Sequence, residues 1–220
     1  MKRKRTIHRK KYFFILLYLL LVILAIRYHM TWQMNLERKL LVRQEMQNNG
    51  NADLADSLLR EAECFPVRKD QTGDVQWTFD DGYGGERTYG GKRKHEGIDI
   101  MASKDSPGCL QIQAMADGVV EQMGWLKLGG YRIGIRSHSG IYYYYAHMAE
   151  YADDIQIGDE VKAGTVLGKM GNTGYGEEGT TGKFPVHLHF GIYISVDGQE
   201  QSINPYPILQ YLDVNPNSIE

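Results

Sequence analysis

The hydrophobic pattern of the N-terminal segment differs from that of the rest of the chain. Residues 12–26 form an apolar run without a single charge, and as a helix this run spans about 22 Å, short of the roughly 30 Å of a bilayer core. The residues that follow lengthen it, because Arg27 can extend its charge to the membrane surface while Tyr28 and Trp32 suit the interface. No small-residue cleavage site follows, so we predict an uncleaved transmembrane signal anchor over residues 12–32.

The pattern of residues 33–63 predicts a helical stalk or linker. It is weakly amphipathic up to residue 46, breaks at the Asn-rich residues 48–51, and resumes with apolar residues at every fourth position. These positions are Leu54, Leu58 and Ala62. They suit either a homodimer seam or a helix that packs back on its own domain, and the repeats are too few to choose between the two.

From Cys64 onward, short runs of alternating polar and apolar residues are separated by glycine-rich turns. Runs of this kind, spaced this closely, are typical of strands in an antiparallel all-β domain. We predict strands over residues 118–125, 131–136, 141–148, 165–170 and 186–194. The spacing leaves little room for helix, and we therefore assign residues 64–220 to one all-β domain.

The last of these strands carries two histidines one residue apart. Side chains alternate between the faces of a strand, so Val186, Leu188 and Phe190 are expected in the core while His187 and His189 point together from the opposite face. Histidine is the commonest side-chain metal ligand, and zinc is a frequent occupant of such sites. A surface strand with two polar residues is the plain alternative, so further ligands are needed upstream.

A second histidine motif supplies such ligands. His95 and Asp99 are separated by three residues and can reach one ion, because Gly97 lets the chain bend or approach closely. Together with one of the two late histidines they offer imidazole and carboxylate ligands and leave a coordination position open, as catalytic zinc requires. His147, at the end of a tyrosine-rich strand, is a further candidate for the chemistry.

Charge is distributed unevenly along the chain. The sequence has 25 basic and 27 acidic residues, but eight basic and no acidic residues lie in the first 27 positions, which leaves 17 basic against 27 acidic, a net of −10. Because positive charge stays on the cytoplasmic side of a membrane, residues 1–11 are expected in the cytoplasm and the acidic body outside it. Such a body argues against nucleic acid as a partner. A disulfide between Cys64 and Cys109 is permitted there, but the sequence does not decide whether it forms.

Three motifs, in their order along the chain, resemble those of a known enzyme family. They are His95-x-x-x-Asp99, Tyr145-Ala-His147 and His187-x-His189, joined by glycine turns at residues 158–168 and 171–174. Together they resemble peptidase family M23, the zinc metallopeptidases of the lysostaphin and LytM type. The resemblance covers about residues 75–206 and implies an antiparallel LytM-like fold of the duplicated hybrid-motif kind.

The resemblance also implies roles for individual residues. In the family, the histidine and aspartate of the first motif and the second histidine of the last motif bind Zn²⁺, which carries over to His95, Asp99 and His189. The other two histidines of the motifs face the attacking water, which carries over to His147 and His187 as catalytic residues.

Two groups of residues are expected to line the cleft beside these histidines. A tyrosine six residues before the first ligand lines such sites in the family, and Tyr89 holds this position, where it is expected to donate a hydrogen bond to the developing oxyanion. Tyr143 and Tyr145 share the face of His147 in a regularly alternating strand and are therefore possible cleft walls that bind substrate.

An inserted loop departs from the family pattern. The connection from the Gly-Asn-Thr-Gly turn to the last histidine motif is usually short, whereas this chain inserts residues 175–185. Binding loops on a rigid sheet commonly carry specificity. Glu177 and Glu178 of this loop are therefore candidates for binding a cationic or amine-bearing substrate.

These expectations combine into one functional hypothesis. The chain is expected to be a membrane-anchored, extracytoplasmic zinc metalloendopeptidase that hydrolyses peptide stems or cross-bridges of bacterial peptidoglycan. The substrate class comes from the resemblance, since the motifs specify hydrolysis and not the polymer. The alternative is a non-catalytic LytM-like scaffold that binds cell-wall peptide or a partner ectodomain in sporulation or division. The intact ligand set favours the enzyme, because degenerate scaffolds tend to lose it.

Overall fold

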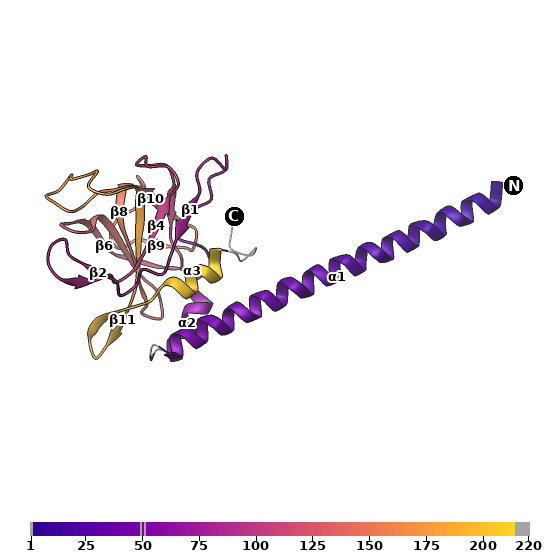
Figure 1. Cartoon of the computed structure of the whole chain (residues 1–220), viewed down its shortest axis with the longest axis horizontal. Coiled ribbons are helices and arrows are strands. Elements are labelled where there is room, and N and C mark those ends of the chain that lie inside the picture. The colour runs from indigo at the N-terminus through magenta and orange to yellow at the C-terminus, as the bar shows by residue number, and fades with distance from the viewer. Residues whose placement is uncertain (1, 49, 51, 214–220) are drawn as a thin grey trace. The chain divides into compact units, whose positions relative to one another are not determined.

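The computed structural model describes residues 2–48, 50 and 52–213, and Figure 1 shows the helices and strands. Contacts divide the chain into two compact units, Met1–Leu41 and Val42–Glu220. The helices are α1 (Lys2–Asn48), α2 (Ala52–Glu61) and α3 (Tyr206–Asp213). The strands are β1 (Trp77–Phe79), β2 (Glu86–Arg87), β3 (Arg93–Lys94), β4 (Ile98–Ala102), β5 (Gln111–Gln113), β6 (Gly118–Leu126), β7 (Gly130–Arg136), β8 (Tyr142–Tyr151), β9 (Glu160–Val161), β10 (Val166–Met170), β11 (His187–Val196) and β12 (Gln199–Ile203).

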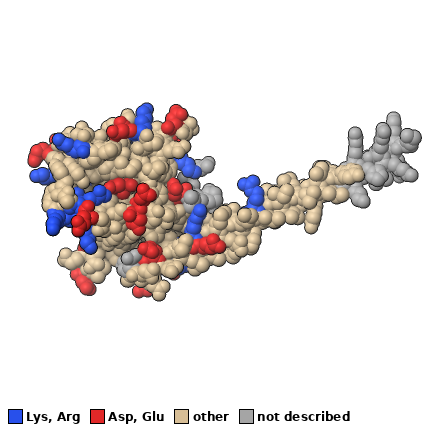
Figure 2. All heavy atoms as spheres, in the orientation of Figure 1, with Lys and Arg blue, Asp and Glu red and all other residues tan. Residues whose placement is uncertain are grey.

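Helix α1 is continuous through the predicted anchor and the first part of the predicted stalk. Among the described residues, one helix is long and apolar enough to cross a membrane, over Tyr12–Asn48. The space-filling view in Figure 2 shows a stretch of this helix without charged side chains, as its sequence requires. Helix α1 is therefore a candidate membrane span. Met1 of the predicted basic tail lies outside the described residues, as do residues 49 and 51 of the predicted helix break and residues 214–220 of the predicted β domain.

The second helix packs on its own domain. Ala55 and Leu58 on α2 are each 1 % exposed, and Val42 and Met46 near the end of α1 are also buried in the same hydrophobic core. The compact β-rich unit therefore begins at residue 42, earlier than the position 64 at which the strand pattern starts. Since Leu58 is already buried against the domain, the predicted apolar seam of residues 54–62 is not available for a homodimer.

The β-rich unit is built on one ten-stranded antiparallel sheet. Its main strand order is β1-β4-β11-β8-β7-β6-β9, while β12 pairs with β11, and β10 pairs with both β5 and β8. Strands β2 and β3 form a separate hairpin. Strand β11 lies between β4 and β8, with His189 opposite Asp99 on one side and opposite Ala146 on the other. This register brings the three sequence motifs together in the middle of the sheet.

The predicted alternation of β11 is confirmed. Val186, Leu188 and Phe190 are fully buried in the core, and the two histidines between them point to the opposite face. All five strands predicted from the sequence are present. The prediction that the domain has little room for helix missed α3, a single amphipathic helix whose buried residues cover part of the core, namely Ile208, Leu209, Tyr211 and Leu212.

The two cysteines are not joined. Both thiols are free, and that of Cys64 donates a weak hydrogen bond to the carbonyl oxygen of Ala114 at 3.1 Å. Burial raises the pKa of the Cys64 thiol to about 11. The sequence left open whether these cysteines form a disulfide, and in this structure they are separate thiols.

Candidate active site

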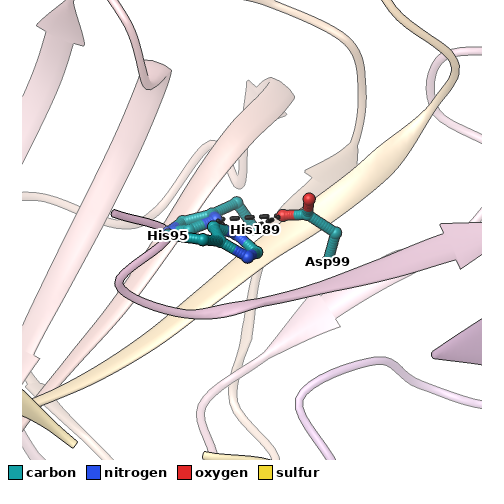
Figure 3. Close-up of side chains that lie close together, drawn as sticks. All are labelled: His95, Asp99 and His189. Atoms are coloured by element: carbon teal, nitrogen blue, oxygen red, sulfur yellow. Dashed lines mark hydrogen bonds and ion pairs between the residues drawn. The ribbon is translucent and has the colours of Figure 1, made fainter. Parts of the chain in front are cut away.

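Three predicted ligands converge on one point. His189 lies on β11 directly opposite Asp99 on β4, and His95 begins the short loop that leads from β3 into β4. Their atoms His95 Nε2, Asp99 Oδ1 and His189 Nδ1 are each 3.0 Å from the other two. Figure 3 shows the two rings and the carboxylate facing a common centre. We call these three residues the triad.

The donor chemistry of the triad fits a cation. Nδ1 of His95 lies 2.9 Å from the carbonyl oxygen of Gly82, which only accepts, so this nitrogen carries the proton. In the neutral ring, Nε2 of His95 then turns a lone pair toward the carboxylate of Asp99, which is another acceptor. Two acceptors at this distance make a poor hydrogen bond but suitable metal ligands. Ligands of a tetrahedral zinc, with bonds of about 2.0–2.1 Å, lie about 3.3 Å apart, close to the spacing within the triad.

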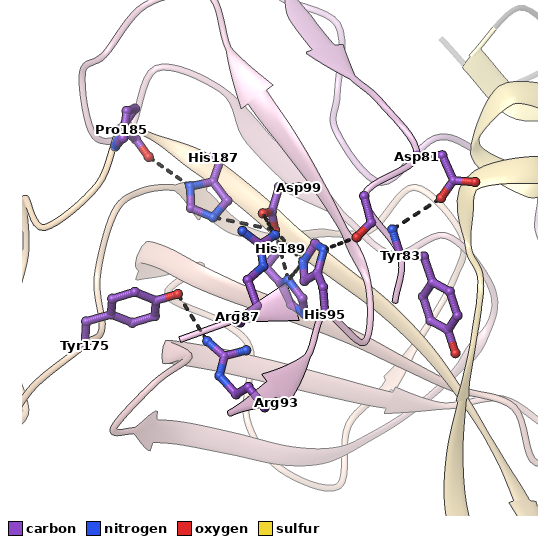
Figure 4. Close-up of polar contacts among 11 residues, drawn as sticks. Asp81, Tyr83, Arg87, Arg93, His95, Asp99, Tyr175, Pro185, His187 and His189 are labelled. Atoms are coloured by element: carbon purple, nitrogen blue, oxygen red, sulfur yellow. Dashed lines mark hydrogen bonds and ion pairs between the residues drawn. The ribbon is translucent and has the colours of Figure 1, made fainter. Parts of the chain in front are cut away.

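Neighbouring groups fix the orientation of each triad residue. Arg87 donates a hydrogen bond of 2.6 Å to Oδ2 of Asp99, which leaves only Oδ1 to face the histidines. Gly97 makes room for the ring of His189, because a Cβ at this position would lie 2.8 Å from its Nε2. The bonds that orient His95 and Asp99 are drawn in Figure 4. Such outer contacts set the tautomer and the direction of metal ligands.

The local electrostatics keep the triad in the protonation states that a metal needs. Burial raises the pKa of Asp99, but contacts with His189 and His95 outweigh it and hold this pKa well below its usual range. Burial lowers the pKa of His189, and Asp99 offsets only part of this effect. These shifts favour a carboxylate at Asp99 and a neutral imidazole at His189, the forms that bind a metal.

Two more histidines stand beside the triad. The rings of His147 and His187 are 4.7 Å apart, and Nε2 of His187 is 3.8 Å from Oδ1 of Asp99. Each Nδ1 donates to a carbonyl oxygen, that of Thr173 at 2.7 Å and that of Pro185 at 2.9 Å. Both Nε2 atoms are therefore lone-pair acceptors when the rings are neutral. Burial lowers both pKa values, that of His147 strongly.

A bulge in β8 delivers His147 to this face. Tyr145 pairs with Ile133 while Met148 pairs with Tyr131, so three steps on β8 match two on β7. His147 holds a left-handed backbone with φ of 63°. The extra residue is what allows a side chain next to the core strand positions to point into the site.

The same bulge makes the prediction for Tyr143 and Tyr145 wrong. Both side chains are fully buried in the core, where the hydroxyl of Tyr145 accepts a hydrogen bond from the backbone N–H of Met115. In a regular strand, Tyr143 and Tyr145 would lie on the same face as His147. The bulge adds one residue before His147, so the two tyrosines lie on the opposite face. The cleft is instead lined by Tyr142 and Tyr144.

Tyr89 does not line the cleft either. Its ring stacks on that of Tyr175 at 4.3 Å, and its hydroxyl donates to the carbonyl oxygen of Tyr175 at 2.6 Å. Tyr89 is also 48 % exposed. In this structure the hydroxyl hydrogen of Tyr89 is used to hold the inserted loop, so its role as an oxyanion donor stays a prediction.

The inserted loop borders the cleft, but through other residues than predicted. Glu177 and Glu178 are exposed and do not line the cleft, so their binding of substrate stays a prediction. The loop folds on itself, with the backbone and hydroxyl of Thr180 both bonded to the carbonyl of Glu177. Its cleft-lining residues are Tyr175, Phe184 and Pro185.

The cleft itself has a volume of about 810 Å³ and contains the triad, His147 and His187. Sequence reasoning missed Arg87, Arg93 and Arg132, which also line it. Arg132 was detectable in principle, because it alternates with the apolar Ile133 on a predicted strand. Nothing in the spacing of the β2–β3 hairpin indicated that Arg87 would reach Asp99.

Known proteins with a similar sequence or structure belong to the family that the three histidine motifs resemble. The L-Ala--D-Glu endopeptidase of Bacillus subtilis is 42% identical over 146 residues, which cover 66% of this chain and 42% of that protein. Lysostaphin of Staphylococcus simulans is 29% identical over 118 residues, covering 53% of this chain and 21% of that protein. The chain thus spans less than half of the length of these relatives. Its structure superposes on that of LytM from Ruminococcus gnavus with a TM-score of 0.68 and 48% identity, covering 75% of this chain and 66% of that chain. The sequence profile of peptidase family M23 matches residues 93–205, just over half of the chain, and the chain belongs to this family.

Proposed function

We propose that this chain is a zinc-dependent endopeptidase that hydrolyses peptide bonds in bacterial peptidoglycan. The observation that carries the proposal is the triad, with three potential ligand atoms 3.0 Å apart, beside two further histidines that present lone pairs to the same cleft. Membership in peptidase family M23 supports peptide hydrolysis. The peptidoglycan substrate is proposed from the names of the relatives, among them an L-Ala--D-Glu endopeptidase and a glycyl-glycine endopeptidase.

Zn²⁺ would be held by His95, Asp99 and His189. When bound, it supplies a Lewis acid that polarises a carbonyl oxygen and lowers the pKa of a coordinated water to about 7. Two features prepare the ligands for this: burial favours the neutral imidazole of His189, and Arg87 keeps one oxygen of Asp99 occupied.

His147 and His187 are proposed to handle the protons. A neutral imidazole whose Nδ1–H is fixed on a carbonyl can take a proton at Nε2 from the attacking water and later give it to the departing amine. The second imidazole, once it carries a proton, stabilises the negative charge that develops on the carbonyl oxygen. The two rings lie 4.7 Å apart, so both can serve one reacting centre.

Helix α1 is proposed to anchor the enzyme in the cytoplasmic membrane. Its apolar run follows a cluster of basic residues, which places the N-terminus in the cytoplasm and the β domain outside. This topology corresponds to the predicted cytoplasmic tail at 1–11 and anchor at 12–32, whereas the predicted linker at 33–63 and peptidase domain from 64 are revised, because the compact unit already begins at residue 42. Protease added to intact spheroplasts should release the β domain, and complete protection would contradict this orientation.

The experiment that tests the function uses the full-length chain purified in detergent. We expect about one zinc per chain and release of peptide fragments from purified peptidoglycan. Asp99→Ala should abolish both, while the exposed His138→Ala should change neither. A chain that binds peptidoglycan peptide but releases no fragments at full zinc occupancy would instead support the non-catalytic scaffold.

A further inference from the structure

The cleft carries positive charge that its own ion pairs do not neutralise. Two of its arginines are committed: Arg87 bonds Asp99, and Arg136 bonds both Glu121 and Glu200. The remaining two arginines, Arg93 and Arg132, form no ion pair with any carboxylate in the described part of the chain.

Of the two, Arg132 has the larger number of buried N–H donors left without a protein acceptor in the described ranges. Its Nη2 donates to the neutral side-chain oxygen of Gln122 at 3.1 Å, and its buried Nη1 has no acceptor among the described residues. A guanidinium is always charged and carries five N–H donors, so a single neutral acceptor leaves most of its capacity unused. Such an arrangement is costly in a protein that binds nothing there.

Arg93 presents the same incomplete pattern from the β2–β3 hairpin. Its Nη2 donates to the hydroxyl of Tyr175 at 3.2 Å, and its buried Nε has no acceptor among the described residues. Figure 4 shows Arg93 and Tyr175 on the same side of the histidines. The exposed Lys94 adds a positive charge to the cleft lining and the exposed Glu96 a negative one, so these two offset each other.

The sheet register places Arg132 level with the triad. His189 pairs with Ala146 on β8, and the β7 segment opposite Ala146 is the one between Tyr131 and Ile133. Two strand spacings of about 4.8 Å therefore separate the backbones of His189 and Arg132, or about 10 Å in all. An extended peptide covers this distance in about three residues.

The floor between the two residues is aromatic. Tyr144 lies with its ring 6.0 Å from that of His189, and its hydroxyl lies at Gly129, where a Cβ would be only 2.4 Å away. Burial raises the pKa of Tyr144, and the nearby charge of Arg132 partly offsets this. Arg132 therefore lies close to a neutral, partly apolar surface, where a charged hydrogen bond is stronger than in water.

We propose that Arg132, assisted by Arg93, binds a carboxylate of the substrate peptide within about three residues of the bond to be cut. This inference rests on the proposed function in that the ligand is the peptide to be hydrolysed. It gives the cleft a preference for acidic peptides, the opposite of the amine-bearing substrate expected from Glu177 and Glu178. A peptide of glycine alone offers no such carboxylate.

A glutamyl residue joined to the next residue through its side-chain carboxyl meets this requirement. One carboxyl of that residue is used in the peptide bond, and the other remains as a free carboxylate on the main chain. Conversion of the free carboxylate to a carboxamide removes the charge and keeps the shape. The pair of peptides that differ only in this group therefore isolates the interaction with Arg132.

The test compares hydrolysis and binding of this peptide pair by the full-length chain. We expect kcat/KM of the zinc-loaded chain to be about 10- to 100-fold higher for the carboxylate peptide. Arg132→Gln should lower kcat/KM far more for the carboxylate peptide than for the carboxamide peptide, so that the difference between the two peptides disappears. Arg132→Lys should keep part of the preference, and Arg93→Gln should reduce it to a smaller extent. Lys127→Gln, which removes an exposed charge outside the cleft, should behave as the parent.

Equal treatment of the two peptides by the parent chain would overturn the inference, as would an Arg132→Gln variant that loses both activities equally. Binding of the labelled peptides to the metal-free chain, measured by fluorescence anisotropy, separates this result from failure of the proposed function. If neither peptide is cut, carboxylate-dependent binding that Arg132→Gln abolishes still supports the subsite. Equal binding of both peptides, or binding of neither, would overturn it.

Discussion

Arg87 holds the carboxylate oxygen of Asp99 that the two histidines do not contact. The guanidinium lies 2.6 Å from Oδ2, whereas Oδ1 lies 3.0 Å from both His95 Nε2 and His189 Nδ1. Because Arg87 sits on the β2–β3 hairpin and not on the main sheet, the geometry of the triad depends on an element outside the sheet that carries it. The hairpin is therefore expected to contribute to the metal affinity of the triad.

Arg87→Gln should weaken zinc binding without removing a ligand. Loss of an outer contact to a ligand typically costs about 10- to 100-fold in metal affinity, and Asp99 would be free to rotate or bind with both oxygens. Competition with a chromogenic chelator measures this affinity. The control is Lys92→Gln, which removes an exposed positive charge from the same hairpin and lies outside the cleft. Equal affinity of the Arg87 variant and the parent would show that the ion pair has no positioning role.

Asp99→Ala and His189→Ala should each lose stoichiometric zinc. Either change leaves two protein ligands, too few for tight binding by a site of this kind. Metal analysis after dialysis against zinc-buffered solution gives the readout. Retention of one zinc per chain by both variants would remove the triad as the metal site.

His147→Ala and His187→Ala should keep zinc and lose hydrolysis. Neither residue belongs to the triad, and general acid–base catalysis typically contributes about 10²- to 10⁴-fold to the rate. The measurement is kcat on a peptide substrate at equal zinc occupancy. A variant that turns over at the parental rate would exclude its histidine from the mechanism.

Gly97→Ala should disturb the site through packing alone. The added Cβ would lie 2.5 Å from the carbonyl oxygen of Phe190 and 2.8 Å from the ring of His189, so β4 and β11 must separate. Overpacking of this kind typically costs about 1–3 kcal/mol in the free energy of unfolding. Gly82→Ala is the matched control, because its Cβ would meet His95 at an ordinary 3.4 Å. Equal melting temperatures of the two variants would contradict this account.

The buried thiol of Cys64 should make the protein less stable at alkaline pH. Its pKa is raised from 9.0 to about 11 by burial, so between these values the unfolded chain releases a proton that the folded chain keeps. The free energy of unfolding should therefore fall by about 1.4 kcal/mol per pH unit from pH 9 to 11 on account of this group. Denaturant titrations of the parent and Cys64→Ala over this window measure the difference. Parallel pH profiles would mean that the thiol is accessible to solvent in the folded state.

The site was predictable from sequence where regular alternation holds. Strand β11 is regular, so His187 and His189 could be placed on one face from Val186, Leu188 and Phe190 alone. Ligand chemistry suggested that this strand meets the His95 motif, the family resemblance selected His189 as the ligand, and the register of β4 against β11 gives the structural basis. Pairing of β4 with β11 sets Asp99 opposite His189, and the loop before β4 adds His95.

The residues that sequence reasoning misplaced depend on tertiary contacts. Tyr143 and Tyr145 were assigned to the wrong face because a bulge has no reliable local signal in the sequence. Tyr89 was placed by its distance along the chain from His95, whereas its partner is Tyr175, 86 positions away. Charge suggested that Glu177 and Glu178 bind substrate, although a surface turn exposes acids equally well.

The left-handed residue in β8 makes this strand sensitive to length in a way that its neighbours are not. Before the bulge the tyrosines alternate between the cleft, at positions 142 and 144, and the core, at positions 143 and 145. Deleting one residue between Tyr145 and Met148 would restore regular alternation and turn His147 away from the cleft or the tyrosines out of the core. An alignment of relatives should therefore show no insertion or deletion within this strand. A gap there would mark a relative in which the residue at the position of His147 no longer reaches the cleft.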